Sequence, residues 1–386
     1  MILEQPFGTG EFPDALRLRT TDPAEQPAVD RYHRWLAEPD ADSPAAVASG
    51  LGAYAPLVGV VAYTVGLADA PPADDRDLSA ELRALVLSAQ AAAAIDSADR
   101  GELERAVALL ESADLPPEAG LAATRAELHH ALGGLAHEEA AAAGEPLTEA
   151  MGHYYAALRL VSEASAPLLW AALQLDLATA QLASPMKEAT DQLRIGVAAQ
   201  ALRASRRVFT PEQQPGPWSM ATLNLANALV YLPSTHQGDN LVEAVELYEE
   251  VLASGIRDGD TGGRARLLAN QGNALAHLGI FDQAGAKLAE ARFLFESVLD
   301  HEGALLVRQV QDEIARASVV HGEEDDELAA LARKAEQMSR MPAEHTDART
   351  SGMGVAVVPG AVTPPEEAQR RAKVTVLDRH EAGDRS

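Results

Sequence analysis

The feature of this sequence that most restricts its fold is a residue pattern that occurs five times. Each occurrence has four residues, mostly small or apolar, at spacings of three, four and three, which brings them to one face of an α-helix. The first residues of successive occurrences are 44, 48, 46 and 40 positions apart. The five sets are Leu103, Ala106, Leu110 and Ala113; Leu147, Ala150, Tyr154 and Ala157; Ile195, Ala198, Leu202 and Ser205; Leu241, Ala244, Tyr248 and Val251; and Phe281, Ala284, Leu288 and Ala291.

A further apolar helix is expected before each of the five sets. Stretches rich in proline or glycine, such as 114–117 and 211–217, separate the resulting pairs, and such residues stop a helix from continuing. Five helix pairs at this period predict a solenoid of stacked helical repeats, and the alternative is a generic helical bundle with chance periodicity. The expected first helices of the pairs cover 79–97, 121–143, 167–182, 219–232 and 264–278.

The stretch from Trp218 to Glu296 resembles tetratricopeptide (TPR) repeats. Its small residues stand where two antiparallel helices of such a repeat touch, and its larger residues stand around that contact. The resemblance implies an all-α, TPR-like solenoid of about five helix pairs, and it indicates no particular member of the family. The residues that carry it are Leu268, Gly272, Leu275, Gly279, Phe281, Ala284, Leu288 and Ala291, with Ala226, Asn227, Leu241, Ala244 and Tyr248 in the preceding pair.

The same resemblance implies a binding groove, because the first helix of each TPR pair lines a concave surface. Asn227 and Asn270 match the two asparagine positions of TPR domains that clamp a partner's C-terminal carboxylate, and Arg308 matches one basic position. Leu223 and Ala304 stand where that clamp needs lysines, which weakens its electrostatic half. Hydrogen bonding between helices is the alternative role for the asparagines. The expected groove residues are Met220, Leu223, Asn227, Tyr231, Arg266, Asn270, Asn273, His277 and Arg308.

Composition restricts the partners and the chemistry. A formal net charge of −27 repels nucleic acid and anionic membranes, so we exclude both as general partners. The chain has no cysteine, which excludes disulfides, thiolate metal ligands and cysteine nucleophiles. Alanine is abundant and lysine is rare, a bias typical of high-GC, actinobacterial-like bacterial genes. The first residues lack the basic-then-apolar order of a signal peptide, and a cytoplasmic location is expected.

Residues 1–78 are expected to form an N-terminal segment that is partly irregular and partly helical. No charged residue occurs from 43 to 68, and we interpret this run as a buried helical hairpin packed on the first helix pair. Proline, four glycines and acidic flanks disfavour a membrane span there, and a membrane-associated segment is the alternative. A short helix over 27–38 would carry Val29, Tyr32, Trp35 and Leu36 on its apolar side.

The repeat region is expected to span 79–320. A helix over 302–319 would cap the fifth pair or open a sixth, and it is the alternative occupant of the groove. The stretch 321–341 is interpreted as an acidic run with a terminal helix, and the stretch 342–386, rich in proline, glycine and threonine, as a disordered tail.

The sequence contains no recognised pattern of catalytic or metal-binding residues. Four histidines (His129, His130, His137 and His153) lie near one another along the chain. His130 and His137 are two helical turns apart, which is too far to share one metal ion. The glycine pairs are not followed by the Gly-Lys-Ser/Thr of a phosphate loop, and no Gly-x-Ser-x-Gly nucleophile motif occurs. We therefore expect no catalytic site, no metal and no cofactor.

These observations predict a non-enzymatic protein-protein interaction scaffold, adaptor or assembly factor that holds a peptide or helix of another protein. The second hypothesis is a ligand- or peptide-sensing regulatory module, in which the groove closes on its ligand and alters another partner. The third is an enzyme of unknown type, because a fold does not decide a function. Residues 1–70 contain no recognised output motif, which favours the scaffold.

Overall fold

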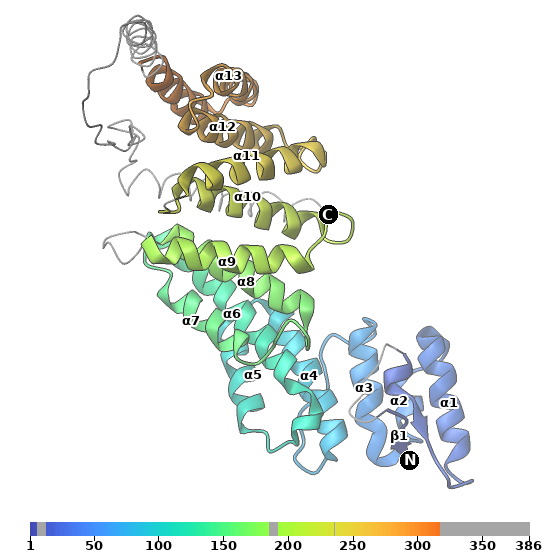
Figure 1. Cartoon of the computed structure of the whole chain (residues 1–386). Helices are drawn as coiled ribbons and strands as arrows, with labels where there is room; N and C mark the ends of the chain where they lie inside the picture. The colour runs from blue at the N-terminus through green and yellow to red at the C-terminus, as the bar shows by residue number, and fades with distance from the viewer. Residues whose placement is uncertain (6–12, 185–191, 235, 317–386) are drawn as a thin grey trace, which may run out of the picture. The chain divides into compact units, whose positions relative to one another are not determined.

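The chain is predominantly helical in the residues that this computed structural model describes, which are 1–5, 13–184, 192–234 and 236–316 (Figure 1). This confirms the all-α fold class. The strands among these residues are β1 (Ile2–Leu3) and β2 (Leu18–Arg19), which form one short antiparallel pair. The terminal helix and tail expected over 321–386 lie outside the described residues. Short 3-10 turns lie at Asp14–Leu16, Pro39–Ala41, Gly52–Tyr54 and Pro117–Ala119.

The N-terminal segment has its own apolar core. Helix α1 (Gln26–Ala37) buries the four apolar residues that its periodicity predicted. The hydroxyl of Tyr32 donates a hydrogen bond to the carbonyl oxygen of Leu16 at 2.8 Å. Leu16 and Leu18 belong to a stretch expected to be irregular, yet both are buried in this core, because the β1–β2 pair brings the stretch back onto α1.

The uncharged run 43–68 forms two short helices, α2 (Pro44–Ala48) and α3 (Ala55–Thr64), which pack on each other. Helix α3 buries Leu57, Val58 and Val61 and also packs on the following helix, so the buried interpretation of this run is correct. None of the described helices is long and apolar enough to cross a membrane.

Ten further helices follow, at the places that the five-fold pattern predicted. Residues 301–316 are helical up to the end of the described part. The ten helices are α4 (Ala80–Ser97), α5 (Arg100–Ser112), α6 (Leu121–Ala143), α7 (Thr148–Leu158), α8 (Pro167–Ala183), α9 (Gln192–Val208), α10 (Pro215–Tyr231), α11 (Gln237–Ala253), α12 (Thr261–His277) and α13 (Phe281–Ser297).

The chain divides into two compact units, Met1–Ala180 and Gln181–Ser386. In the first unit, α4 packs on α5, α5 on α6 and α6 on α7, and α4 also touches α6. In the second unit, α9 to α13 pack in sequence in the same way, and α10 also touches α12. Each unit is therefore helical-repeat-like: a helix contacts the next helix and the equivalent helix of the next pair.

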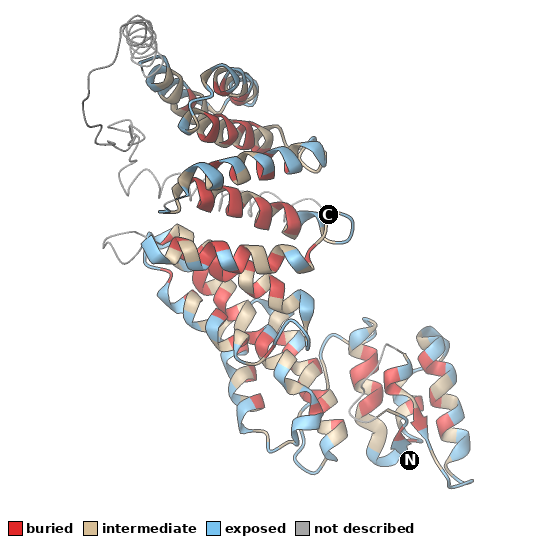
Figure 2. Ribbon diagram, in the orientation of Figure 1, coloured by how far each residue is buried: buried red, intermediate tan, exposed pale blue. Residues whose placement is uncertain are grey.

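The residues of the five-fold pattern contribute to the core of both units. Figure 2 shows that the helices of both units carry buried residues. All residues of the pattern are buried except Ala113 and Phe281, which are partly exposed. Close helix contacts occur at glycines. A Cβ atom added to Gly272 would lie 2.7 Å from Cγ of Leu288, and one added to Gly133 would overlap the ring of Tyr154. The expected small residue at Gly272 is confirmed; the same role of Gly133 was missed.

Candidate functional site

Ion pairs join the second helices of successive pairs. In the second unit, Arg203 of α9 lies 2.8 Å from Glu243 of α11, and these residues are 40 positions apart. Lys287 of α13 lies 3.2 Å from Glu249 of α11, at a separation of 38. In the first unit, Arg100 of α5 reaches Glu149 of α7 at 2.6 Å, at a separation of 49. These separations are close to the period of the sequence pattern, so the ion pairs connect neighbouring helix pairs.

Polar contacts also join the first helices of successive pairs. In the first unit, Nε2 of His130 on α6 lies 2.6 Å from Oδ2 of Asp176 on α8, and 46 residues separate them. In the second unit, Nδ2 of Asn270 on α12 donates to Oδ1 of Asn227 on α10 at 3.0 Å, and 43 residues separate them. Polar contacts between residues about one sequence period apart therefore link the first helices of successive pairs, and likewise the second helices.

The contact between α10 and α12 forms the centre of the candidate site. Oδ1 of Asn227 accepts two hydrogen bonds, one from Asn270 and one from the hydroxyl of Tyr248 on α11 at 2.5 Å. The asparagine side chain is therefore held by two other helices. Nδ2 of Asn227 makes no hydrogen bond to any part of the chain that the structure describes, which leaves a donor of fixed orientation at the helix surface.

The expected groove residues form two strips. On α10 they are spaced three, four and four residues apart, and on α12 four, three and four, so each strip occupies one helix face. Most of these side chains are partly exposed, between neighbours that are buried, and His277 at the end of α12 is exposed. The Asn227–Asn270 bond joins the strips near their middle. The α10 strip is Met220, Leu223, Asn227 and Tyr231, and the α12 strip is Arg266, Asn270, Asn273 and His277.

Arg308 is not connected to these strips. It is exposed on the helix of residues 301–316, and no hydrogen bond or ion pair within the described chain links it to α10 or α12. The interhelical hydrogen bond, which was the alternative role for the two asparagines, is present. It uses Oδ1 of Asn227 and Nδ2 of Asn270, so only Nδ2 of Asn227 and Oδ1 of Asn270 remain for a partner.

The helix of residues 301–316 packs against the end of the fifth pair. Its Val307 joins an apolar cluster with Leu268 of α12 and Leu288 and Phe295 of α13. None of these four residues belongs to the two strips. The helix that was considered as an alternative occupant of the groove therefore buries a different surface of α12 in the described residues.

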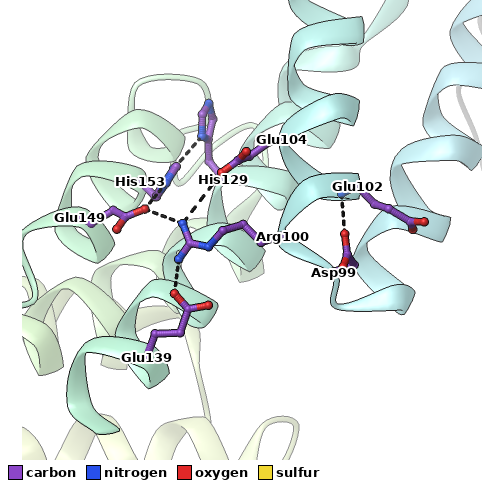
Figure 3. A network of polar contacts seen from close by, with 8 residues as sticks. All are labelled: Asp99, Arg100, Glu102, Glu104, His129, Glu139, Glu149 and His153. Atoms are coloured by element: carbon purple, nitrogen blue, oxygen red, sulfur yellow. Dashed lines mark hydrogen bonds and ion pairs between the residues drawn. The ribbon is translucent and has the colours of Figure 1, made fainter. Parts of the chain in front are cut away.

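A second group of polar residues lies in the first unit, where α5, α6 and α7 meet (Figure 3). Arg100 bonds Glu149 of α7 and Glu139 of α6, both at 2.6 Å, and these hydrogen bonds raise the pKa of the Arg100 guanidinium. Beside it, Nδ1 of His129 on α6 lies 3.3 Å from Nδ1 of His153 on α7. The described part of the chain contains no group of three or more histidines or carboxylates that could hold a metal ion.

Sequence reasoning missed both the histidine contact and the Tyr248 hydrogen bond. Only His130 and His137 were compared, by their spacing along one helix, whereas His129 and His153 meet across two helices. That contact depends on how α6 and α7 align, which the apolar pattern leaves undetermined to within a turn. Tyr248 was assigned to the core from its register; its ring is buried as expected, and its hydroxyl reaches Asn227.

Comparison of the chain with protein-family models and with curated proteins gave no match.

Proposed function

We propose that this chain is a non-enzymatic, TPR-like α-solenoid that acts in the cytoplasm as a scaffold, adaptor or assembly factor. It holds a peptide or helix of another protein against the strips of α10 and α12. The observation that carries the proposal is the Asn227–Asn270–Tyr248 hydrogen-bond group, which joins two partly exposed strips from neighbouring repeats.

The two strips combine the features that a recognition surface needs. Met220, Leu223 and Tyr231 supply apolar area, which provides affinity because it leaves water when a partner binds. Nδ2 of Asn227 supplies a donor whose direction is fixed before binding, so little side-chain entropy is lost on forming the complex. The partner is held by apolar area and oriented by a few amide hydrogen bonds.

Two observations support the solenoid. Both helix series carry polar contacts at 38 to 49 residues, close to the sequence period. The helix of residues 301–316 also packs on α12 and α13 as the first helix of another pair would. A TPR-like stack produces both, because each repeat contacts only its neighbours.

The acidic surface indicates the charge of the partner. The formal net charge of −27 disfavours an acidic partner and favours a neutral or basic one. Association should then weaken as salt is added, because long-range attraction between opposite charges is screened.

Site-specific photo-crosslinking from the strips tests the proposal. A photoreactive residue at Met220 or Leu223 should crosslink the same segment of one other protein inside cells. The control position is Glu246, which is exposed on α11 and outside both strips, and it should not crosslink that segment. Crosslinks from Met220 and Leu223 only to other parts of this chain would contradict the proposal, because the strips would then be covered from within.

A double variant then connects binding to the strips. Leu223→Ala with Asn273→Ala should weaken the affinity for the crosslinked segment about tenfold or more, a loss typical of a few central contacts. The matched control, Glu246→Ala with Gln283→Ala, changes two exposed residues of α11 and α13 and should leave the affinity unchanged. Equal affinity for both double variants would place the binding surface elsewhere.

A further inference from the structure

The two histidines between α6 and α7 approach each other through the same ring atom. Nδ1 of His129 and Nδ1 of His153 are 3.3 Å apart, and the rings lie 5.6 Å between centroids with a tilt of 34° (Figure 3). The residues are 24 positions apart, on two helices that pack along each other. The contact therefore connects the helices directly.

Such a contact is a hydrogen bond only when one proton lies between the two nitrogens. One ring must carry a hydrogen on Nδ1 and donate it, and the other must have a bare Nδ1 and carry its hydrogen on Nε2. In the neutral pair, His129 and His153 are therefore opposite tautomers.

One added proton does not break this bond. It binds Nε2 of the donating ring, which is remote from the contact, and the bond becomes charge-assisted. When His153 is the donor, this Nε2 is the atom that lies 4.0 Å from Oε1 of Glu149, and the carboxylate stabilises the added charge. Glu149 is in turn bonded to Arg100 of α5.

A second added proton has only one free place, the bare Nδ1 of the accepting ring. Both Nδ1 atoms would then carry hydrogens at a separation of 3.3 Å, and both rings would be positively charged. The hydrogen bond is lost, and two like charges in contact repel. The two histidines thus titrate as a coupled pair, in two steps.

The groups around the two histidines both lower and raise their pKa values. Burial is the largest cause that lowers the pKa of each histidine, and the partner histidine lowers the pKa of His129 further. Neighbouring carboxylates raise these pKa values and neighbouring guanidiniums lower them. The charged groups concerned are Arg100, Glu104 and Glu111 on α5, Arg125 on α6, Glu149 on α7, and Arg159 at the end of α7.

We propose that His129 and His153 form a proton-controlled clasp between α6 and α7, closed with up to one added proton and open when both rings are charged. Helix α6 also carries His130, which contacts Asp176 of α8, and Glu139, which contacts Arg100 of α5. Opening the clasp therefore loosens the helix on which three contacts of the first unit converge. This inference is independent of the proposed function, because the α10–α12 strips belong to the other unit.

Nitrogen-15 NMR of the histidine rings in the unmodified full-length chain tests the protonation states. At about pH 7.5 the rings should be opposite tautomers, and on acidification they should titrate in two steps, the second well below the usual histidine value of about 6.5. Identical tautomers, or two independent single-step titrations, would overturn the proposal. No variant is required, so a folding defect cannot obscure the result.

Hydrogen exchange then tests whether the clasp opens the unit. After correction for the intrinsic effect of pH on exchange, amides of α6 and α7 should lose at least tenfold protection between about pH 7.5 and about pH 5. The double variant His129→Gln with His153→Gln should not show this loss, since glutamine does not titrate. His236→Gln changes an exposed histidine of the other unit and should leave the loss unchanged. The same loss in the double variant would refute the clasp.

Discussion

In both units, a polar contact joins the first helices of successive pairs between residues about one sequence period apart, but the contacting groups differ. In the first unit, His130 and Asp176 are in contact at 2.6 Å, and both are ionisable. In the second unit, Asn270 bonds Asn227 at 3.0 Å, and both are neutral amides. The repeat period determines where helices meet, but not which groups meet there. Removing one partner should therefore cost more stability at the first link than at the second, because the first link includes a buried carboxylate.

The largest effect should come from the feature that the units share, which is a small residue at the helix contact. Ala150 and Ala284 hold the same place in the five-fold pattern, and both are fully buried. Ala150→Trp and Ala284→Trp should each lower the free energy of unfolding by about 3 kcal/mol, because an indole cannot fit without separating the helices. Urea titration followed by circular dichroism measures this. Ala289→Trp, at an exposed position of α13, is the control, and unchanged stability in both core variants would mean that the register is wrong.

The second prediction compares the two links directly. Asp176→Ala removes a buried carboxylate from a hydrogen bond with His130 and should cost about 2 kcal/mol of unfolding free energy at neutral pH. Asn270→Ala removes a neutral, partly exposed partner and should cost about 1 kcal/mol. Chemical denaturation of both variants under the same conditions gives the ranking. A larger loss for Asn270→Ala would contradict the distinction between a charged and a neutral link.

Between about pH 7.5 and about pH 5.5, a loss of stability on acidification should appear in the helices of the first unit that hold His129 and His153. Burial lowers the pKa of His129 and His153 in the folded state, so the folded chain binds fewer protons there than the unfolded chain. The resulting stability is fully present above the unfolded value of about 6.5 and is lost as pH falls from there towards the lower folded values. Amide exchange at about pH 7.5 and about pH 5.5 should show the loss in α6 and α7. An equal loss in α10 and α12 would remove the contrast between the units.

The smallest effects should come from the ion pairs between second helices. Arg203→Ala and Lys287→Ala each remove one exposed pair, and each should lower the free energy of unfolding by less than about 1 kcal/mol. The difference from the wild type should shrink further in about 1 M salt, because salt screens exposed charges. Thermal unfolding at low and high salt checks this. A loss comparable with that of Asp176→Ala would mean that these ion pairs contribute more to the free energy of unfolding than their exposure indicates.

The sequence was sufficient to predict helices, because apolar residues spaced three and four apart fall on one face of a helix but not of a strand. Register residues such as Leu103, Tyr154 and Leu288 are buried where the pattern placed them. Gly272 was recognised as a close contact, since a small residue among large ones at that spacing is a strong signal. The N-terminal β1–β2 pair was missed, because two-residue strands leave no periodicity to detect.

The polar contacts were less predictable than the helices. Asn227 and Asn270 were selected as a pair from the TPR resemblance, and they do meet. Their partner Tyr248 and the contact of His129 with His153 were not foreseen. Such contacts depend on the rotation of one helix against another by part of a turn, which apolar residues of similar size tolerate and hydrogen bonds do not.

The central claim is that polar contacts join the equivalent helices of neighbouring pairs, and a double-mutant cycle between Asn227 of α10 and Asn270 of α12 tests it most directly. Unfolding free energies are measured for the wild type, Asn227→Ala, Asn270→Ala and the double variant. The control combines Asn227→Ala with Ala289→Gly, at an exposed position of α13. The account predicts a coupling of about 1 kcal/mol between the two asparagines and additive effects in the control. A coupling between Asn227 and Asn270 no larger than in the control would contradict it, because residues of α10 and α12 that share a hydrogen bond cannot act independently.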